Sequence, residues 1–144
     1  MLDRRPEVVV VGNRPHVRVV SAELQVDGRY LITQRRKDAV LPSLWEFPGG
    51  RVREGEADAE ALRRCLRDRV GLDVVVGEAT MEVTHAYEAY DLTLAVYRCE
   101  LPYRQEARPV TVAAVAWVAP EAFGSYVFPG ADQQTVDALV GSAE

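Results

Sequence analysis

The stretch from residue 45 to residue 72 constrains the fold of this chain most strongly. It contains Pro-Gly-Gly at positions 48–50, which ends a short apolar segment. Farther along, apolar residues recur at steps of three and four: Ala59, Leu62, Leu66 and Val70. That period predicts a helix over 56–70 with one buried stripe, and Gly71 is a suitable residue to end it.

The segments around this helix predict a sheet. Eight segments are rich in β-branched and aromatic residues: 8–11, 17–26, 30–34, 45–47, 74–76, 80–87, 91–99 and 110–118. Asp27-Gly28 predicts a tight hairpin turn, and 35–44 reads as a loop. A short helical turn is expected at 120–123 and a C-terminal helix at 132–140, with Asp132 near its N-cap. The prediction is one domain over 1–144, with a mixed sheet and two helices.

Composition limits the setting in which the chain works. Hydrophobic residues make up 48% of it, enough for one compact core. No apolar run approaches the roughly 18 residues that span a bilayer, and the first residues lack the apolar core of a secretion signal. Cys65 and Cys99 are too few for a disulfide framework, so both are interpreted as reduced thiols. A cytoplasmic protein without a membrane partner is expected.

The charge pattern separates two kinds of anionic partner. A formal charge of −5 argues against nucleic acid, whose binding requires many clustered basic residues. The arginines nevertheless gather in the middle third of the sequence: Arg35, Arg36, Arg51, Arg53, Arg63, Arg64, Arg67 and Arg69. Two interpretations stay open at this point, a solvated helix face and a pocket for a small phosphorylated ligand.

Six residues stand at a spacing that resembles the signature of the Nudix family: Gly50, Glu56, Arg64, Leu66, Gly71 and Leu72. The three glutamates that follow the arginine in that signature are Cys65, Asp68 and Arg69 in this chain. The resemblance is to the branch of antimutator 8-oxo-dGTP and CTP pyrophosphohydrolases, and it covers nearly the whole chain. It implies the Nudix fold, an α/β/α sandwich of the α+β class around a central mixed sheet.

The three replacements weaken the chemistry that the resemblance implies. In Nudix enzymes the matching glutamates hold a divalent metal, and Mg²⁺ prefers oxygen ligands. A thiol is a poor ligand for it, and a guanidinium repels a cation. Glu56 and Asp68 remain as residual catalytic and metal candidates for weakly held Mg²⁺ or Mn²⁺. Thr111 stands where related hydrolases often carry a glutamate, and Glu54, Glu60 or Glu106 are candidates to replace the lost acids.

The residues that the resemblance implies for ligand binding are mostly present, unlike the metal-binding glutamates. Its substrate-binding candidates are Arg35, Glu46, Gly49, Gly50, Arg64, Arg69 and Asp132. The arginines would contact phosphates, because a guanidinium pairs bidentately with phosphate, and Asp132 would hydrogen-bond a base. Each has a plainer alternative: Arg35 as a surface residue at a strand end, the glycines as an ordinary turn, and Asp132 as a helix N-cap.

Three functions fit this pattern. The leading hypothesis is a degenerate Nudix domain that binds a nucleotide or another phosphorylated ligand, with pyrophosphohydrolase activity lost or strongly reduced. The first alternative is a weakly active nucleoside triphosphate pyrophosphohydrolase that depends on Mg²⁺ or Mn²⁺. The second is a protein-interaction or self-association module whose cleft is vestigial.

Overall fold

The computed structural model describes residues 9–11, 14–39 and 43–143. Its elements follow in the order β1 (Val9–Val11), β2 (Arg14–Val26), β3 (Arg29–Gln34), β4 (Trp45–Glu46), β5 (Gly49–Arg51), α1 (Asp58–Val70), β6 (Val75–Ala86), β7 (Asp91–Glu100), β8 (Ala114–Val118), the 3-10 helix η1 (Pro120–Ser125) and α2 (Gly130–Ala143). Within the described ranges, no helix combines the length and the apolar character that a bilayer crossing needs.

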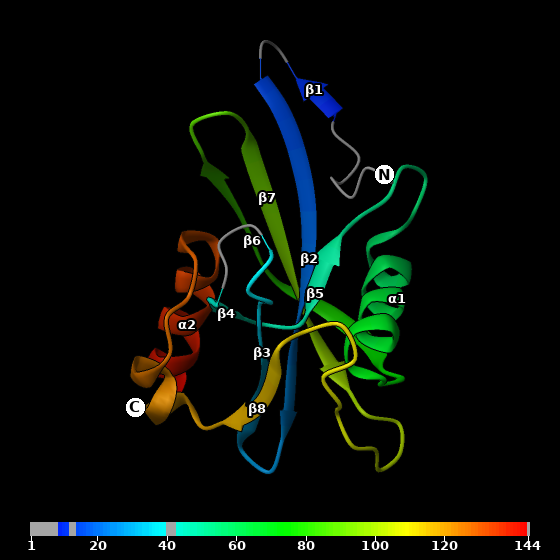
Figure 1. The fold of residues 1–144 in the computed structure, drawn as a ribbon, viewed down its shortest axis with the longest axis vertical. Coiled ribbons are helices and arrows are strands. Elements are labelled where there is room, and N and C mark those ends of the chain that lie inside the picture. The colour runs from blue at the N-terminus through cyan, green and yellow to red at the C-terminus, as the bar shows by residue number, and fades with distance from the viewer. Residues whose placement is uncertain (1–8, 12–13, 40–42, 144) are drawn as a thin grey trace.

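The strands form one mixed sheet with the order β4-β3-β2-β7-β6. β2 runs parallel to β7, while β6 pairs antiparallel with β7 and β8 pairs antiparallel with β3. β1 and β5 also pair with β2, outside this strand order. The helices α1 and α2 lie on opposite sides of this sheet (Figure 1). The predicted fold class, a mixed sheet between helices, is confirmed.

The hairpin between β2 and β3 has the predicted turn. Asp27 and Gly28 both adopt positive φ angles, 52° and 78°. Two consecutive left-handed residues are the geometry of the tight turn that matches the twist of antiparallel strands. Gln25 then pairs with Tyr30, and Val26 with Arg29. This local turn sets the register of β3, the strand from which Arg35 follows.

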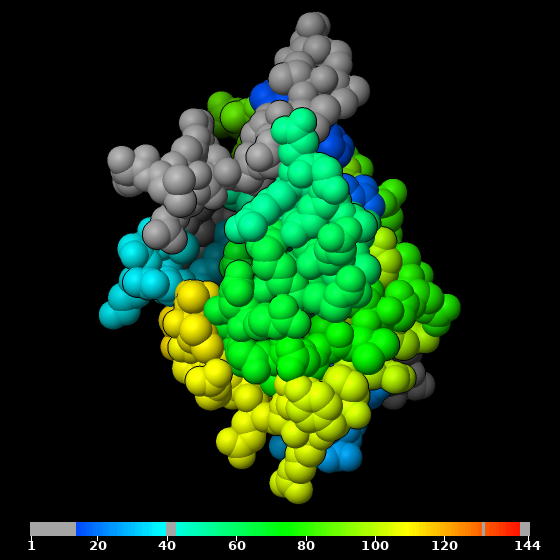
Figure 2. All heavy atoms as spheres, turned by 90° about the vertical axis from the view of Figure 1, so that its right-hand side faces the viewer, coloured from blue at the N-terminus to red at the C-terminus, as the bar shows by residue number. Residues whose placement is uncertain are grey.

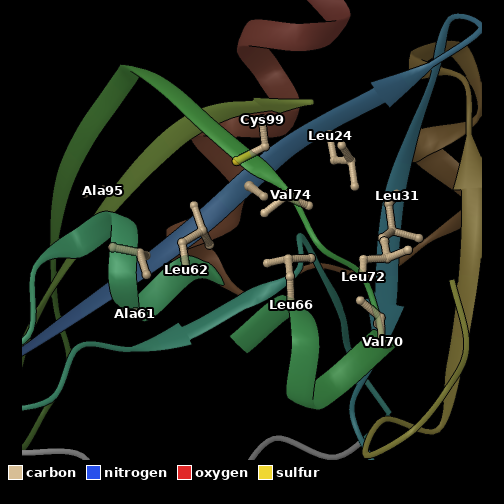
Figure 3. Packing of buried hydrophobic residues seen from close by; sticks show 12 residues of the cluster. Leu24, Leu31, Ala61, Leu62, Leu66, Val70, Leu72, Val74, Ala95 and Cys99 are labelled. Atoms are coloured by element: carbon tan, nitrogen blue, oxygen red, sulfur yellow. The ribbon is translucent and has the colours of Figure 1, made fainter. Parts of the chain in front are cut away.

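The main core lies between α1 and the sheet (Figure 3). The helix contributes Ala61, Leu62, Cys65, Leu66 and Val70. β2 contributes Val20, Ala22 and Leu24 from alternate positions, as a strand must. Ala59, predicted in the buried stripe, is only half-buried, and Ala61 and Cys65 are buried instead. The predicted end of the helix is confirmed, because Gly71 has a φ of 71° and donates its N–H to the Arg67 carbonyl.

A second core lies on the other side of the sheet. It contains Ile32, Phe47, Val118, Phe123, Val136 and Leu139. Phe47 meets Phe123 edge to face at 5.8 Å between ring centroids, and it stacks on Phe128 at 5.5 Å. These contacts fix the segment before Pro-Gly-Gly against the start of α2. The two cores therefore hold the middle of the chain from both faces of the sheet.

Several predicted boundaries were wrong. The segments 74–76 and 80–87 form one irregular strand, β6, with register shifts near Ala79. Residues 49–51 form β5, although Pro-Gly-Gly at 48–50 predicts the end of a strand there. Residues 110–113 are not in a strand, and β8 begins at Ala114. Helix α2 begins at Gly130, which places Asp132 in its first turn and not at its N-cap.

Candidate functional site

A cleft of about 360 Å³ opens along β2, β5 and the C-terminal end of α1. Six of the predicted ligand-binding residues line it: Arg35, Glu46, Gly49, Gly50, Arg69 and Asp132. They come from segments far apart in the sequence, which the sheet and the two helices bring together. The cleft is also lined by three apolar residues, Val19, Leu92 and Leu94. Further polar lining residues are Arg36, Arg51, Tyr87, Tyr90 and Thr111.

The two glycines form part of the cleft wall because side chains do not fit there. β5 pairs with β2, with Gly49 opposite Ser21 and Gly50 opposite Val20. A Cβ atom on Gly49 would overlap the Val20 carbonyl oxygen. A Cβ atom on Gly50 would stand 2.7 Å from Cys65 Sγ and 3.0 Å from Arg69 Nη2. The close packing of backbone against α1 therefore brings the Arg69 guanidinium directly beside the Gly50 backbone.

The three positions of the lost glutamates occupy different environments. Cys65 is 1% exposed and packs in the core under Gly50. Asp68 is exposed and does not line the cleft, whereas Arg69 is half-buried and does. Among the residues that the structure describes, no three His, Cys, Asp or Glu side chains are grouped so that they could hold a metal ion. The cleft wall formed by α1 therefore presents a cation.

Arg64 and Glu56 form an ion pair outside the cleft. Arg64 Nε and Nη2 donate to the two Glu56 carboxylate oxygens, each at 2.8 Å, and Nη2 also donates to the Arg51 carbonyl at 3.0 Å. The Arg53 N–H donates to Glu56 as well. Hydrogen bonds from Arg64 lower the pKa of Glu56 to about 2, and those to Glu56 raise the pKa of Arg64. Both predicted site residues thus fix the loop that leads into α1.

Arg35 is held at the cleft by Glu46. Its Nε and Nη2 donate to the two carboxylate oxygens of Glu46, both at 3.1 Å. The Arg35 N–H bonds to the Leu44 carbonyl, which closes the loop between β3 and β4. Burial alone would lower the pKa of Arg35, but the Glu46 carboxylate outweighs it and the pKa is raised. The guanidinium is therefore a fixed charge with a defined orientation.

Asp132 brings a carboxyl group from the first turn of α2 into the cleft. It is 7% exposed. Burial raises its pKa to about 8, and the Glu46 carboxylate adds to the effect, while Arg35 and a hydrogen bond from the Phe47 backbone oppose it. A carboxyl group with that pKa is mostly protonated at neutral pH. It can therefore both donate and accept a hydrogen bond.

Arg51, one of the arginines clustered in the sequence, is a cleft residue that the resemblance does not include among the predicted binding residues. It is the last residue of β5 and lies partly buried in the cleft. Burial lowers its pKa, and the nearby positive charges of Arg35 and Arg69 lower it further, against opposing effects of Tyr90 and Glu46. The signal that could have identified it is its position directly after Gly49-Gly50. The two glycines let β5 pack closely on β2, so the next residue of the strand also lies at the cleft.

The segment 108–111 is tied to the C-terminal end of α1. Arg108 donates its N–H to the Val70 carbonyl at 2.9 Å. Val110 and Thr111 donate theirs to the Arg69 carbonyl at 3.0 and 3.2 Å. Figure 2 shows this part of the chain, in yellow, lying against the green surface of α1. Thr111 thereby reaches the cleft, whereas Glu54, Glu60 and Glu106, the candidate replacement acids, are exposed and do not line it.

Comparison with known proteins identifies relatives of this chain and of its fold. A family model described as NUDIX domain matches residues 19–138. CTP pyrophosphohydrolase of Escherichia coli (strain K12) is 29% identical over 125 residues, which cover 86% of this chain and 91% of that protein. The solution structure of the E. coli ORF135 protein superposes with a TM-score of 0.77 at 27% identity, covering 92% and 94% of the two chains. The crystal structure of the MutT protein from Methanosarcina mazei Go1 gives a TM-score of 0.80 at 17% identity, covering 93% and 99%.

Proposed function

Because the chain belongs to the Nudix hydrolase family, we propose that its cleft binds a nucleotide through arginines and hydrolyses it weakly or not at all. The ligand is a nucleoside di- or triphosphate or a similar small phosphorylated molecule. Its phosphates contact Arg69, Arg51 and Arg35, and its base contacts the end of the cleft at Asp132. The positive charges of these side chains replace the metal ion that carries charge in hydrolytic members of the family.

The observation that carries this proposal is the position of Arg69. Its guanidinium lies beside Gly50 and lines the cleft. A divalent cation about 4 Å from a guanidinium would be repelled by several kcal/mol near protein. The described residues offer no group of three acids, histidines or cysteines to compensate for that repulsion. Phosphate oxygens, in contrast, pair directly with a guanidinium.

The charges around the cleft favour a small anion. Four arginines line it, Arg35, Arg36, Arg51 and Arg69, against the two carboxyl groups of Glu46 and Asp132. Asp132 is largely neutral at pH 7 because its pKa is raised to about 8. The whole chain carries a formal charge of −5, so the positive potential is local. Such a site attracts a compact polyphosphate more effectively than a long polyanion, which would also meet the acidic surface.

The competing proposal is a weak hydrolysis that depends on the remaining acids. The similarity to CTP pyrophosphohydrolase over most of both chains favours this alternative. It would use Glu56 and Asp68 with Mg²⁺ or Mn²⁺. Glu56 is already bound by Arg64 and by the Arg53 N–H, and Asp68 is exposed outside the cleft. A residual activity would therefore be slow, because losing a positioned base alone costs about 10² to 10⁴ in rate.

Calorimetry separates the two proposals. Nucleoside di- and triphosphates are titrated into the protein in EDTA, and phosphate release is followed separately with Mg²⁺ and with Mn²⁺. We expect binding in EDTA, a loss of about 10- to 100-fold in affinity for Arg69→Gln, and no change for Arg63→Gln, a control on the exposed face of the same helix. Absence of binding to every nucleotide would refute the proposal and leave the protein-interaction module. Turnover that Asp68→Ala abolishes would establish the enzymatic alternative.

A further inference from the structure

The hydroxyl of Ser21 is buried beside the cleft and has no hydrogen-bond partner among the described residues. Ser21 is 2% exposed and lies on β2, between Gly49 of β5 and Val96 of β7. No described residue bonds its Oγ atom. Buried polar groups are nearly always paired, because an unpaired one has lost its bonds to water without replacement. An unpaired hydroxyl in a ligand cleft therefore suggests a partner that arrives with the ligand.

Packing does not account for a serine at this position. Val19 lies on the same face of the sheet as Ser21. Their partners on β7, Leu94 and Val96, lie on that face as well. These neighbours form a small apolar cluster into which alanine would fit. Glu23, the next residue on the same face, does find a partner, because Thr80 donates to it at 2.7 Å. Of these two neighbouring polar residues, only Ser21 lines the cleft.

The direction of the side chain identifies the part of the ligand that it would meet. Val20, Ala22 and Leu24 pack under α1, so the alternating residue Ser21 faces the other side of the sheet, the side that α2 covers. Asp132 enters the cleft from α2, and Phe47, Leu92 and Leu94 add apolar walls. Arg69, in contrast, reaches the cleft from α1. The α2 side thus combines flat apolar contact with two polar groups, as a heteroaromatic ring requires.

We propose that Ser21 is a specificity-determining residue whose hydroxyl forms a hydrogen bond with the base of the bound nucleotide. This inference rests on the proposed function. Since the four common bases present different donors and acceptors, the hydroxyl would favour some bases over others. It would not contribute to the binding of the phosphates, which the arginines hold.

The test compares nucleotides with an anion that has no base. Binding of the four ribonucleoside triphosphates and of tripolyphosphate is measured in EDTA for the wild type and for Ser21→Ala. We expect the variant to lose roughly 5- to 100-fold in affinity for the preferred nucleotide, less for the others and nothing for tripolyphosphate. Its Tm should rise by about 2–4 °C, since a buried unpaired hydroxyl is removed. Ser21→Thr keeps a hydroxyl and should retain part of the preference.

A buried hydroxyl with partners provides the matched control. Thr93 Oγ1 lies 2.7 Å from His16 Nε2 and 3.0 Å from Thr84 Oγ1, and the residue does not line the cleft. Thr93→Val should lower the Tm and leave nucleotide affinity unchanged. Equal nucleotide binding by wild type and Ser21→Ala, an equal loss for all four bases, or a parallel loss of tripolyphosphate binding would overturn this inference alone. A wild type that binds no nucleotide would overturn the proposed function as well.

Discussion

The Arg64 guanidinium donates to both carboxylate oxygens of Glu56 at 2.8 Å and to the Arg51 carbonyl at 3.0 Å. One side chain of α1 thus holds the loop before the helix and the last residue of β5 together. Because Gly49 and Gly50 lie in the same short strand, this pair also supports the cleft wall. Glu56 and Arg64 therefore have a structural role that does not depend on a metal or a substrate.

Glu56→Gln should lower the free energy of unfolding at pH 7 by about 1–3 kcal/mol, because it weakens two charged hydrogen bonds. The pKa of Glu56 lies at about 2 in the folded protein, below its ordinary 4.5. A lowered carboxyl pKa stabilises the fold above the unfolded value, and that contribution is lost as the pH falls from about 4.5 to about 2. Urea unfolding at pH 7 and pH 3 measures this, with exposed Glu54→Gln as control. Equal stability of variant and wild type at pH 7 would contradict it.

Gly49→Ala should destabilise the protein by about 3 kcal/mol or more, since the added methyl group meets backbone that cannot move aside. Gly141→Ala is the control. It lies in α2 with open space around its Cβ position, so alanine should stabilise the helix by roughly 0.5–1 kcal/mol. Thermal unfolding of the two variants checks both signs. A Gly49→Ala protein with wild-type Tm would show that β5 does not pack on β2 as described.

Asp132→Asn should change how stability depends on pH. Burial raises the pKa of Asp132 from its ordinary 3.8 to about 8, so the folded protein keeps a proton that the unfolded chain releases. Wild-type stability should therefore fall as the pH rises from about 4 to about 8, and the variant should lack this fall. Unfolding curves across that range test it, with exposed Asp137→Asn of the same helix as control. A wild type as stable at pH 8 as at pH 5, relative to the variant, would exclude a raised pKa.

The triple variant Cys65→Glu, Asp68→Glu and Arg69→Glu should bind Mn²⁺, because it adds two carboxylates, lengthens the third and removes the cleft cation. Electron paramagnetic resonance of free Mn²⁺ measures the binding directly. The double variant Arg63→Glu and Arg67→Glu places acids on the exposed face of the same helix and should bind Mn²⁺ much more weakly. Adding Thr111→Glu to the triple variant should increase phosphate release, since Thr111 lines the cleft. If the triple variant does not bind Mn²⁺, the three glutamates on α1 do not converge on one site.

The features that the sequence predicted well are those set by local interactions. The α1 period, its end at Gly71 and the Asp27-Gly28 turn all depend on neighbouring residues, and the structure contains each of them. Of the six predicted residues that line the cleft, Gly50 and Arg69 follow from the spacing of the family signature, and the other four follow from the wider resemblance to the family. Arg64 kept its place on α1, but its charge is used within the loop. A signature fixes the position of a residue better than it fixes the partner of its side chain.

Two misjudged segments show the limit of local propensity. Residues 49–51 have poor strand formers, yet they become β5 because β2 offers them a partner. Val110 and Thr111 have good strand character, yet their N–H groups bond to the Arg69 carbonyl instead of a neighbouring strand. Arg51 is absent from the predicted binding residues for the same reason, since its place in the cleft follows from β5. In each case a tertiary hydrogen bond decided the outcome.

The bonds from residues 108–111 to the last carbonyls of α1 make the helix end and this loop a single unit. A ligand that displaces Thr111 would therefore shift Arg69 with it, so these two cleft residues move together. A change of length at residues 108–111 would also displace Arg69, whereas the earlier part of the connection between β7 and β8 is tied to Asp73 through Tyr103 and Gln105.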